Sequence, residues 1–144
     1  MAINEKLIEI RDYTGEGYKP LIDFGAWRVA VLNFSDDLLP ENLNRIQRHN
    51  ETDEVFDLLC GQCVLFLAEG DETATQIYAE NMQPGRIYNV KKGVWHTHTL
   101  SRNAKVLIVE NRDTTYDNSP FCNLSDSQQN AIMELSRKFG KTAR

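Results

Sequence analysis

The chain has 144 residues, of which 41% are hydrophobic and 26% are charged, and this is the size and composition of an ordinary globular domain. Its 16 basic and 21 acidic residues give a net charge of −5, which argues against nucleic-acid or anionic-membrane partners, because both need a positive surface. Glu5 and Lys6 interrupt any secretory leader, and the longest uncharged run is too short to span a bilayer. We expect a single cytoplasmic domain over residues 1–144.

Short runs rich in β-branched and aromatic residues predict β-strands along most of the chain. Polar, glycine-containing turn segments separate them, and no run before residue 124 has a helical period. Many short strands favour an antiparallel sandwich or barrel, here over about residues 20–115. The expected strands are Trp27–Phe34, Glu54–Cys60, Cys63–Glu69, Ala74–Glu80, Arg86–Val90, Val94–Leu100 and Ala104–Glu110.

The carboxyl-terminal segment has a different pattern, which predicts one amphipathic helix over Ser125–Phe139. Ser125 and Gln128 have the spacing of a capping box, and Gly140 is a suitable stop. The apolar side chains recur at helical spacing and should pack on the outside of the β-structure; they are Ala131, Ile132, Leu135 and Phe139.

The three histidines of the chain, His49, His96 and His98, lie at strand edges in two separate segments. Imidazole nitrogens and carboxylates are ligands for Zn, Fe, Mn or Ni. His96 and His98 are two residues apart on a predicted strand and therefore share a face. His49 and Glu54 are five residues apart, so the chain between them must bulge or turn before both can face one ion.

These two segments resemble the two signature motifs of the cupin superfamily. Glu54 and Gly61 have the spacing of the first motif, His49 takes the place of its second histidine, and the run from Gly93 to His96 matches the end of the second motif. The resemblance implies an all-β fold, a single-domain cupin with an antiparallel jelly-roll β-barrel and a C-terminal α-helix. It also implies a divalent transition metal (Zn, Fe, Mn or Ni) held by His49, Glu54 and His96.

One cupin branch, the ureidoglycolate lyases (also called ureidoglycolate hydrolases), is similar to this chain in further pieces. These are Arg28, the pair Arg48-His49, the step from Gly93 to His96 and the closing strand Lys105–Glu110. The chain differs at Asn50, where the family usually has proline, and His98 is shifted by one position. The resemblance implies cleavage of (S)-ureidoglycolate, or of a similar small polar acid, into glyoxylate and urea.

Under this reading His96 would be the general base, and Glu54 would orient it, act as the acid or bind the metal. Arg48 would clamp the substrate carboxylate, for which a guanidinium is well suited. His98, Gln47 and Tyr88 are the other expected substrate contacts.

Other functions fit the same pocket. One is a non-catalytic small-molecule or sugar-binding cupin, and another is a metal-dependent isomerase or dioxygenase. No nucleotide cofactor is expected, because the sequence has neither a Walker loop nor a G-x-G-x-x-G motif. Family analogy also favours a homodimer.

Cys60 and Cys63 form a C-x-x-C pair, a motif that occurs in redox and zinc sites as well as in structural turns. The pair falls on an expected hairpin turn, which favours a turn flanked by buried cysteines. Trp95 should face away from the histidines, since it alternates with His96 along the strand.

Overall fold

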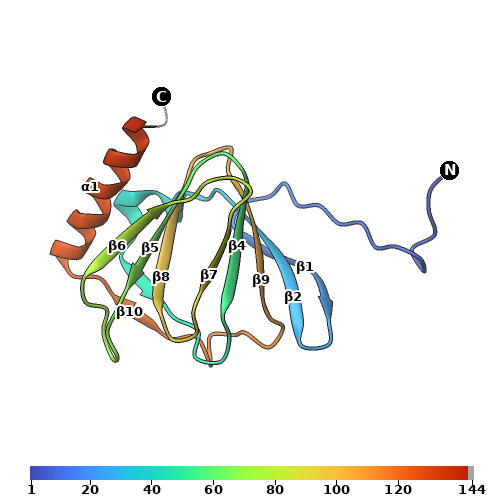
Figure 1. Cartoon of the computed structure of the whole chain (residues 1–144), viewed down its shortest axis with the longest axis horizontal. Helices are drawn as coiled ribbons and strands as arrows, with labels where there is room; N and C mark the ends of the chain where they lie inside the picture. Colours follow the sequence, from blue (N-terminus) through green and yellow to red (C-terminus); the bar gives the residue numbers. More distant parts are fainter. Residues whose placement is uncertain (143–144) are drawn as a thin grey trace.

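The computed structural model describes residues 1–142, which form two five-stranded antiparallel sheets and one long helix (Figure 1). The first sheet has the strand order β1-β2-β9-β4-β7, and the second has the order β10-β3-β8-β5-β6. The first contains β1 (Tyr18–Phe24), β2 (Trp27–Asn33), β4 (Glu54–Cys60), β7 (Ile87–Val90) and β9 (Lys105–Asn111). The second contains β3 (Arg45–Gln47), β5 (Cys63–Ala68), β6 (Ile77–Asn81), β8 (Trp95–Leu100) and β10 (Phe121–Asn123).

All seven expected strands are present, most of them within one residue of the expected limits. The exception is β6, which begins at Ile77 instead of Ala74, because the amide of Thr75 bonds to the carbonyl of Glu69 and closes a turn there. The sequence did not predict β1, β3 or β10, so β-structure extends beyond residues 20–115. Two short 3-10 helices, Asp36–Leu38 and Pro40–Asn42, follow β2.

The main core lies between the two sheets, because alternate residues of each strand point inward. Phe56 and Leu58 of β4 meet Leu65 of β5 and Leu100 of β8 in this layer. The sheets pack face to face and remain two separate sheets, which is the sandwich form that the strand pattern allowed rather than the closed barrel that the cupin resemblance implied. This open arrangement leaves a polar cavity beside the core.

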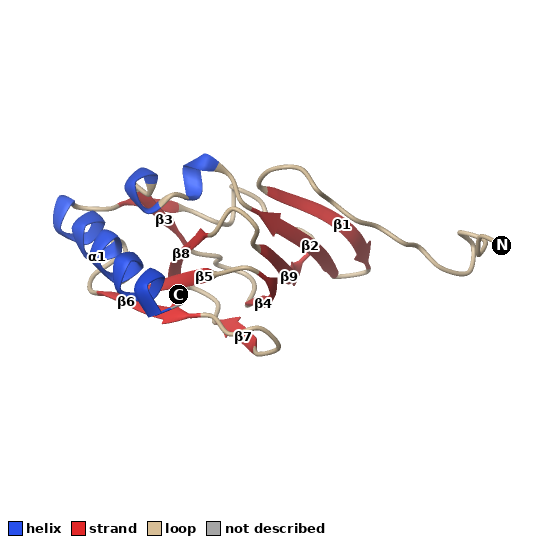
Figure 2. Ribbon diagram, turned by 90° about the horizontal axis from the view of Figure 1, so that it is seen from above, coloured by secondary structure: helices blue, strands red, loops and turns tan. Residues whose placement is uncertain are grey.

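A second core fills the space between the β5-β6-β8 side and helix α1 (Asp126–Thr142), which lies at the opposite end of the molecule from the amino terminus (Figures 1 and 2). Ile132 of the helix is fully buried there beside Phe66 and Trp95. The expected capping box is confirmed: the amide of Gln128 bonds to Ser125 Oγ at 3.2 Å, and the amide of Ser125 bonds to Gln128 Oε1 at 2.9 Å. The expected stop at Gly140 is wrong, because the helix continues to Thr142.

The C-x-x-C pair sits on the tight turn between β4 and β5, as expected. Gly61 adopts φ 75°, a left-handed conformation that suits glycine. Cys63 is buried, and burial raises the pKa of its thiol to about 12, so it is unreactive. Cys60 is exposed, which corrects the expectation that both cysteines are buried.

Among the described residues, no helix is both long and apolar enough to cross a bilayer.

Candidate active site

A cavity of about 1200 Å³ opens between the two sheets and contains all three histidines. Strands from both sheets contribute to its wall, because their inward-facing side chains change from apolar to polar at this end. The polar and charged residues of the inner wall are Tyr18, Arg28, Gln47, His49, Glu54, His96, His98, Glu110 and Ser119.

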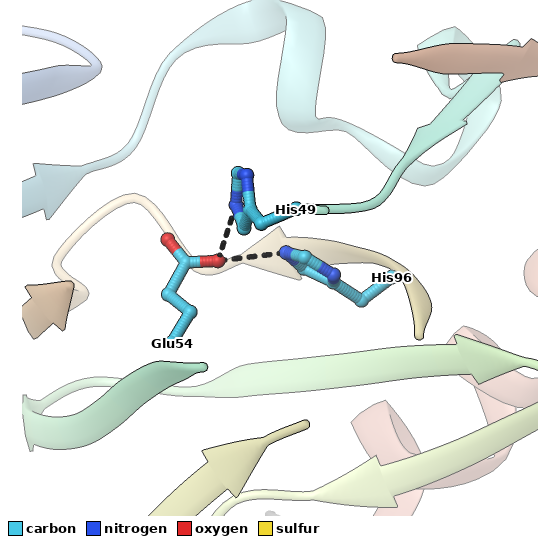
Figure 3. A group of neighbouring side chains, drawn as sticks. All are labelled: His49, Glu54 and His96. Carbon is cyan, nitrogen blue, oxygen red and sulfur yellow. Dashed lines mark hydrogen bonds and ion pairs between the residues drawn. The ribbon is translucent and has the colours of Figure 1, made fainter. Parts of the chain in front are cut away.

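His49, Glu54 and His96 converge on one point of this cavity (Figure 3). Glu54 Oε2 lies 2.9 Å from His49 Nε2 and 2.7 Å from His96 Nε2, and all three side chains are buried. Glu54 begins β4 in the first sheet, whereas His96 belongs to β8 in the second sheet and His49 follows β3. The group therefore joins the two sheets.

The turn between His49 and Glu54 makes this convergence possible, as the spacing of the two residues required. Asp53 fixes the turn from outside: its carboxylate accepts hydrogen bonds from the Lys92 amide at 2.8 Å and from Asn89 Nδ2 at 3.0 Å. The Gly93 amide donates to the His49 carbonyl at 2.8 Å. The loop before β8 thus holds both ends of the turn.

The hydrogen bonds of His96 define its protonation. Its Nδ1 lies 3.0 Å from the carbonyl of Val94, which only accepts, so Nδ1 carries a proton. Nε2 faces the Glu54 carboxylate, and a hydrogen bond there needs a second proton. Burial alone would lower the pKa of His96, but the hydrogen bond and charge of Glu54 outweigh it and raise this pKa. The ring is an imidazolium when no cation is bound.

Glu54 is the anionic partner of this pair. Its burial favours the neutral acid, but hydrogen bonds from His49 and His96 outweigh burial and lower the pKa of the carboxyl group well below its ordinary value. The carboxylate is therefore ionised at neutral pH.

The donor set fits a transition-metal ion. Two imidazole nitrogens and one carboxylate oxygen lie within 4.8 Å of one another. Ligands about 2.1 Å from a metal are separated by roughly 3 Å or slightly more, so a small opening of the two hydrogen bonds would admit the ion. The outer nitrogens of both rings are already held, His49 Nδ1 by Ser119 Oγ at 2.7 Å and His96 Nδ1 by Val94, as is usual for metal-binding histidines.

A second polar cluster, which sequence reasoning did not single out as a site, lies beside this group. Glu110 Oε1 accepts hydrogen bonds from Arg28 Nε at 3.1 Å, from Arg28 Nη2 at 2.8 Å and from the Tyr18 hydroxyl. Glu110 Oε2 lies 3.9 Å from His49 Nε2. Burial and the charge of Glu54 raise the pKa of Glu110 despite these donors. The sequence signal that could have revealed this cluster is the presence of two charged residues, Arg28 and Glu110, at inward-facing strand positions, because a buried charged side chain needs partners.

His98 lies on the same face as His96 and lines the cavity, as expected. Its ring packs against Phe56, with centroids 6.0 Å apart, and its Nδ1 is buried without a hydrogen-bond partner among the described residues. Burial lowers the pKa of His98 to about 4, so the ring is neutral. His98 does not belong to the converging donor group.

The remaining expected site residues lie in different places. Gln47 lines the cavity, pairs with His96 in the strand register and donates from Nε2 to the Ser119 carbonyl at 3.0 Å. Arg48 points away from the cavity: its guanidinium lies 4.6 Å from the Trp95 ring centroid and bonds to the Asp71 carbonyl.

Tyr88 is also absent from the cavity wall, and its hydroxyl accepts a hydrogen bond from the Gln83 amide. Trp95 faces the second core, as expected from its alternation with His96. The structure thus brings together the expected metal ligands, His98 and Gln47, but places neither Arg48 nor Tyr88 with them.

No protein-family model matches the sequence, and no curated protein is significantly similar to it. Solved structures show clear similarity. A Streptomyces Pac13 variant with uridine aligns over 81% of this chain and 87% of its own, with 11% identity and a TM-score of 0.56. Pac13 is described as a nucleoside dehydratase.

Two larger proteins share the same fold over part of their length. CapF, a capsular polysaccharide assembling protein of Staphylococcus aureus, aligns over 78% of this chain and 34% of its own, with 15% identity and a TM-score of 0.56. The DMSP lyase DddQ of Ruegeria pomeroyi aligns over 72% and 50%, with 14% identity and a TM-score of 0.50. These are cupin-type folds, and the expected fold class is thereby confirmed.

Proposed function

We propose that this cupin-fold chain is a small-molecule lyase whose substrate is ureidoglycolate or a similar small polar acid. The observation that carries the proposal is the convergence of His49, Glu54 and His96 within the cavity. Two structures of the same fold support the reaction class, since one is a dehydratase and the other a lyase. Both names describe elimination reactions, in which a base removes one proton and an acid protonates the leaving group.

His49, Glu54 and His96 would hold a divalent transition ion of the series Zn, Fe, Mn or Ni. When bound, such an ion supplies a Lewis acid that stabilises negative charge on a substrate oxygen. Ser119 and the Val94 carbonyl keep the two rings oriented for that role.

Glu110 is the residue placed to move the substrate proton. Its Oε1 is occupied by Arg28 and Tyr18, whereas Oε2 points toward the converging group. In ureidoglycolate cleavage Oε2 would take the hydroxyl proton as the C–N bond breaks and the new carbonyl forms. The electron pair of that bond goes to the urea nitrogen, which then takes a proton. The proposed base is therefore Glu110, whereas the family resemblance implied that His96 is the base.

His96 has a different role if the enzyme works without a metal. Its imidazolium would then be the acid that protonates the departing nitrogen, and Glu54 would hold the ring in place. Glu110 would remain the base, and His96 would give a proton to the departing nitrogen instead of taking the hydroxyl proton.

Arg45 is the cation available for the substrate carboxylate. It lines the cavity, whereas Arg48 does not, and Arg28 is already engaged by Glu110. Its guanidinium lies 3.8 Å from the ring centroid of Phe121. Phe121 is opposite Gln47 in the strand register, and Gln47 is opposite His96, so Arg45 lies two residues along β3 from the residue that pairs with His96.

The test begins with untagged protein, whose metal content is measured by ICP-MS before and after dialysis against a chelator. Glyoxylate and urea are then assayed after incubation with (S)-ureidoglycolate. We expect near-stoichiometric metal in the wild type and none in His96→Ala. We expect Glu110→Gln to lower kcat at least 100-fold and Arg45→Ala to raise KM about tenfold. Glu80→Gln, an exposed change on β6, is the matched control.

A metal-loaded protein that cleaves neither ureidoglycolate nor a related acid would contradict the lyase proposal. The size of the cavity favours one alternative in that case. At about 1200 Å³ it exceeds the usual range of roughly 300–1000 Å³ for small-molecule pockets, so a sugar- or nucleoside-sized ligand would fit. Binding of such a ligand without turnover would identify a binding cupin.

A further inference from the structure

One part of the cavity wall brings a cation together with aromatic rings. Arg45 of β3 and Phe121 of β10 both line the cavity, because their neighbours Ile46 and Cys122 face the second core instead. Phe121 is opposite Gln47 in the strand register, so Arg45 lies diagonally across from it, a spacing at which a long side chain reaches an aromatic ring. The pairing of the two strands therefore fixes this contact.

The Arg45 guanidinium is held by a ring but has no anionic partner. Its central carbon lies 3.8 Å from the centroid of the Phe121 ring, which places it over the face of that ring. Among residues 1–142 it makes no ion pair and no hydrogen bond. The other arginine of the cavity wall, Arg28, is already paired with Glu110. The N–H groups of Arg45 are therefore free to bind an anion that enters the cavity.

A second ring, that of Tyr116, lies beside Phe121 at the mouth of the cavity. The two ring centroids are 5.8 Å apart, and the ring planes are inclined by 37°. Tyr116 lines the cavity and is nevertheless 79% exposed, so most of its ring is open to a ligand. Asn118 closes the turn that carries this ring: its Oδ1 accepts from the Thr115 amide at 3.0 Å, and its amide donates to the Thr115 carbonyl at 3.2 Å. The ring is thus held in place without being part of a core.

The cavity offers more room than the proposed reaction needs. Ureidoglycolate is much smaller than a drug-sized ligand, whereas the cavity of about 1200 Å³ exceeds the usual range for such ligands, roughly 300–1000 Å³. Arg45 lies about 7 Å along β3, the rise of two strand residues, from the residue that pairs with His96. The cation and the two rings therefore border space beyond the converging group, and this space can accept a further part of the substrate.

We propose that Arg45, Phe121 and Tyr116 form a subsite for a carboxylic acid that carries a flat conjugated ring. The carboxylate accepts hydrogen bonds from the Arg45 guanidinium, and the flat ring stacks on the open face of Tyr116. An aliphatic acid of the same size keeps the charge contact but loses the stacking. This inference rests on the proposed function for the reacting end of the substrate, and it extends the substrate class from ureidoglycolate to larger, ring-bearing acids.

The test compares benzoate with cyclohexanecarboxylate, two acids of equal charge and similar size, of which only benzoate has a flat ring. Their dissociation constants are measured by NMR titration of the full chain. We expect the wild type and Tyr116→Phe to bind benzoate about fivefold more tightly than cyclohexanecarboxylate, whereas Tyr116→Leu should bind both equally. We expect Arg45→Gln to weaken the binding of both acids about tenfold.

The matched control is Tyr78→Leu, at an exposed tyrosine of β6, which should keep the preference for benzoate. Tyr116 and Arg45 are also exposed, so their variants should fold. Three results would overturn the proposal: no binding of either acid, equal affinities in the wild type, or a preference that survives Tyr116→Leu. Unchanged affinities in Arg45→Gln would overturn it as well. The titration measures no turnover, so a failure of the lyase proposal, seen as absent ureidoglycolate cleavage, is distinct from a failure of this subsite.

Discussion

At the scale of single residues, the Glu54 carboxylate and the His96 imidazolium control how the metal-free protein responds to pH. The lowered pKa of Glu54 gives stability that is present above its unfolded value of about 4.5 and lost as pH falls through the folded value. The raised pKa of His96 gives stability that is present below about 6.5 and lost as pH rises through the folded value. The pair therefore stabilises the fold most between the two unfolded pKa values, from about pH 4.5 to about pH 6.5.

Replacing Glu54 should reveal this window. We expect Glu54→Gln to cost about 3 kcal/mol of unfolding free energy at pH 5.5, because it leaves a buried imidazole without its partner. The cost should become smaller as pH rises through the raised folded pKa of His96, because the ring then loses its proton in the wild type. Urea unfolding of metal-free protein over a pH series from 5.5 upward measures this change, with Glu80→Gln as the control. A cost that stays the same across the whole series would contradict the ion pair.

His98 should act in the opposite direction. Its pKa is lowered to about 4 in the fold, so the unfolded chain binds a proton that the folded chain does not take up between about 6.5 and 4. Stability then falls with decreasing pH by about 3 kcal/mol over this interval. His98→Gln has no titrating ring and should lose this part of the acid sensitivity. Urea unfolding of the wild type and of His98→Gln over this pH range measures the difference. If the unfolding free energies of both proteins depended on pH in the same way, His98 would be protonated in the folded protein.

At the scale of elements, much of the site follows from strand alternation, and the rest depends on contacts between distant segments. The face shared by His96 and His98 could be predicted, because it depends only on local geometry. The need for a turn between His49 and Glu54 was also visible. The sequence does not show that the Arg48 side chain points away from the cavity. This orientation follows from packing on Trp95, which belongs to a strand far along the chain.

The missed strands have the same explanation. β3 and β10 are three residues long and pair with each other, and β3 also pairs with β8, so their strand character comes from the pairing. β1 carries Lys19, Pro20 and Asp23, which have low strand propensity, and its register shifts at a bulge after Pro20. The sequence predicts a strand that ends at Glu110, but the hydrogen bonds of this carboxylate come from Arg28 and Tyr18 on two other strands.

The turn before β4 gives a prediction at this scale. Asp53 is exposed and lies outside the cavity, yet its carboxylate fixes the turn that brings Glu54 to His49. We expect Asp53→Ala to weaken metal affinity about tenfold while leaving the stoichiometry at one. Competition with a fluorescent chelator measures this. Asp117→Ala, at another exposed loop aspartate, is the control, and equal affinities for the two variants would exclude a positioning role.

At the scale of the whole molecule, a bound cation should stabilise the fold, because its ligands are brought together only in the folded chain. A metal at 100 times its dissociation constant contributes about 2.7 kcal/mol, which corresponds to a rise in Tm of roughly 5–10 °C for a domain of this size. Thermal denaturation with and without Mn, Ni or Zn measures the rise, and His96→Ala is the control. The same rise in that variant would indicate binding at other groups.

The junction between the sheets has a mechanical consequence. Glu54 comes from one sheet and His96 from the other, so the contact between them is a polar cross-link between the two sheets at the cavity. Any motion that separates the sheets at this point would break that contact, and a cation bound between the two side chains would oppose such a motion.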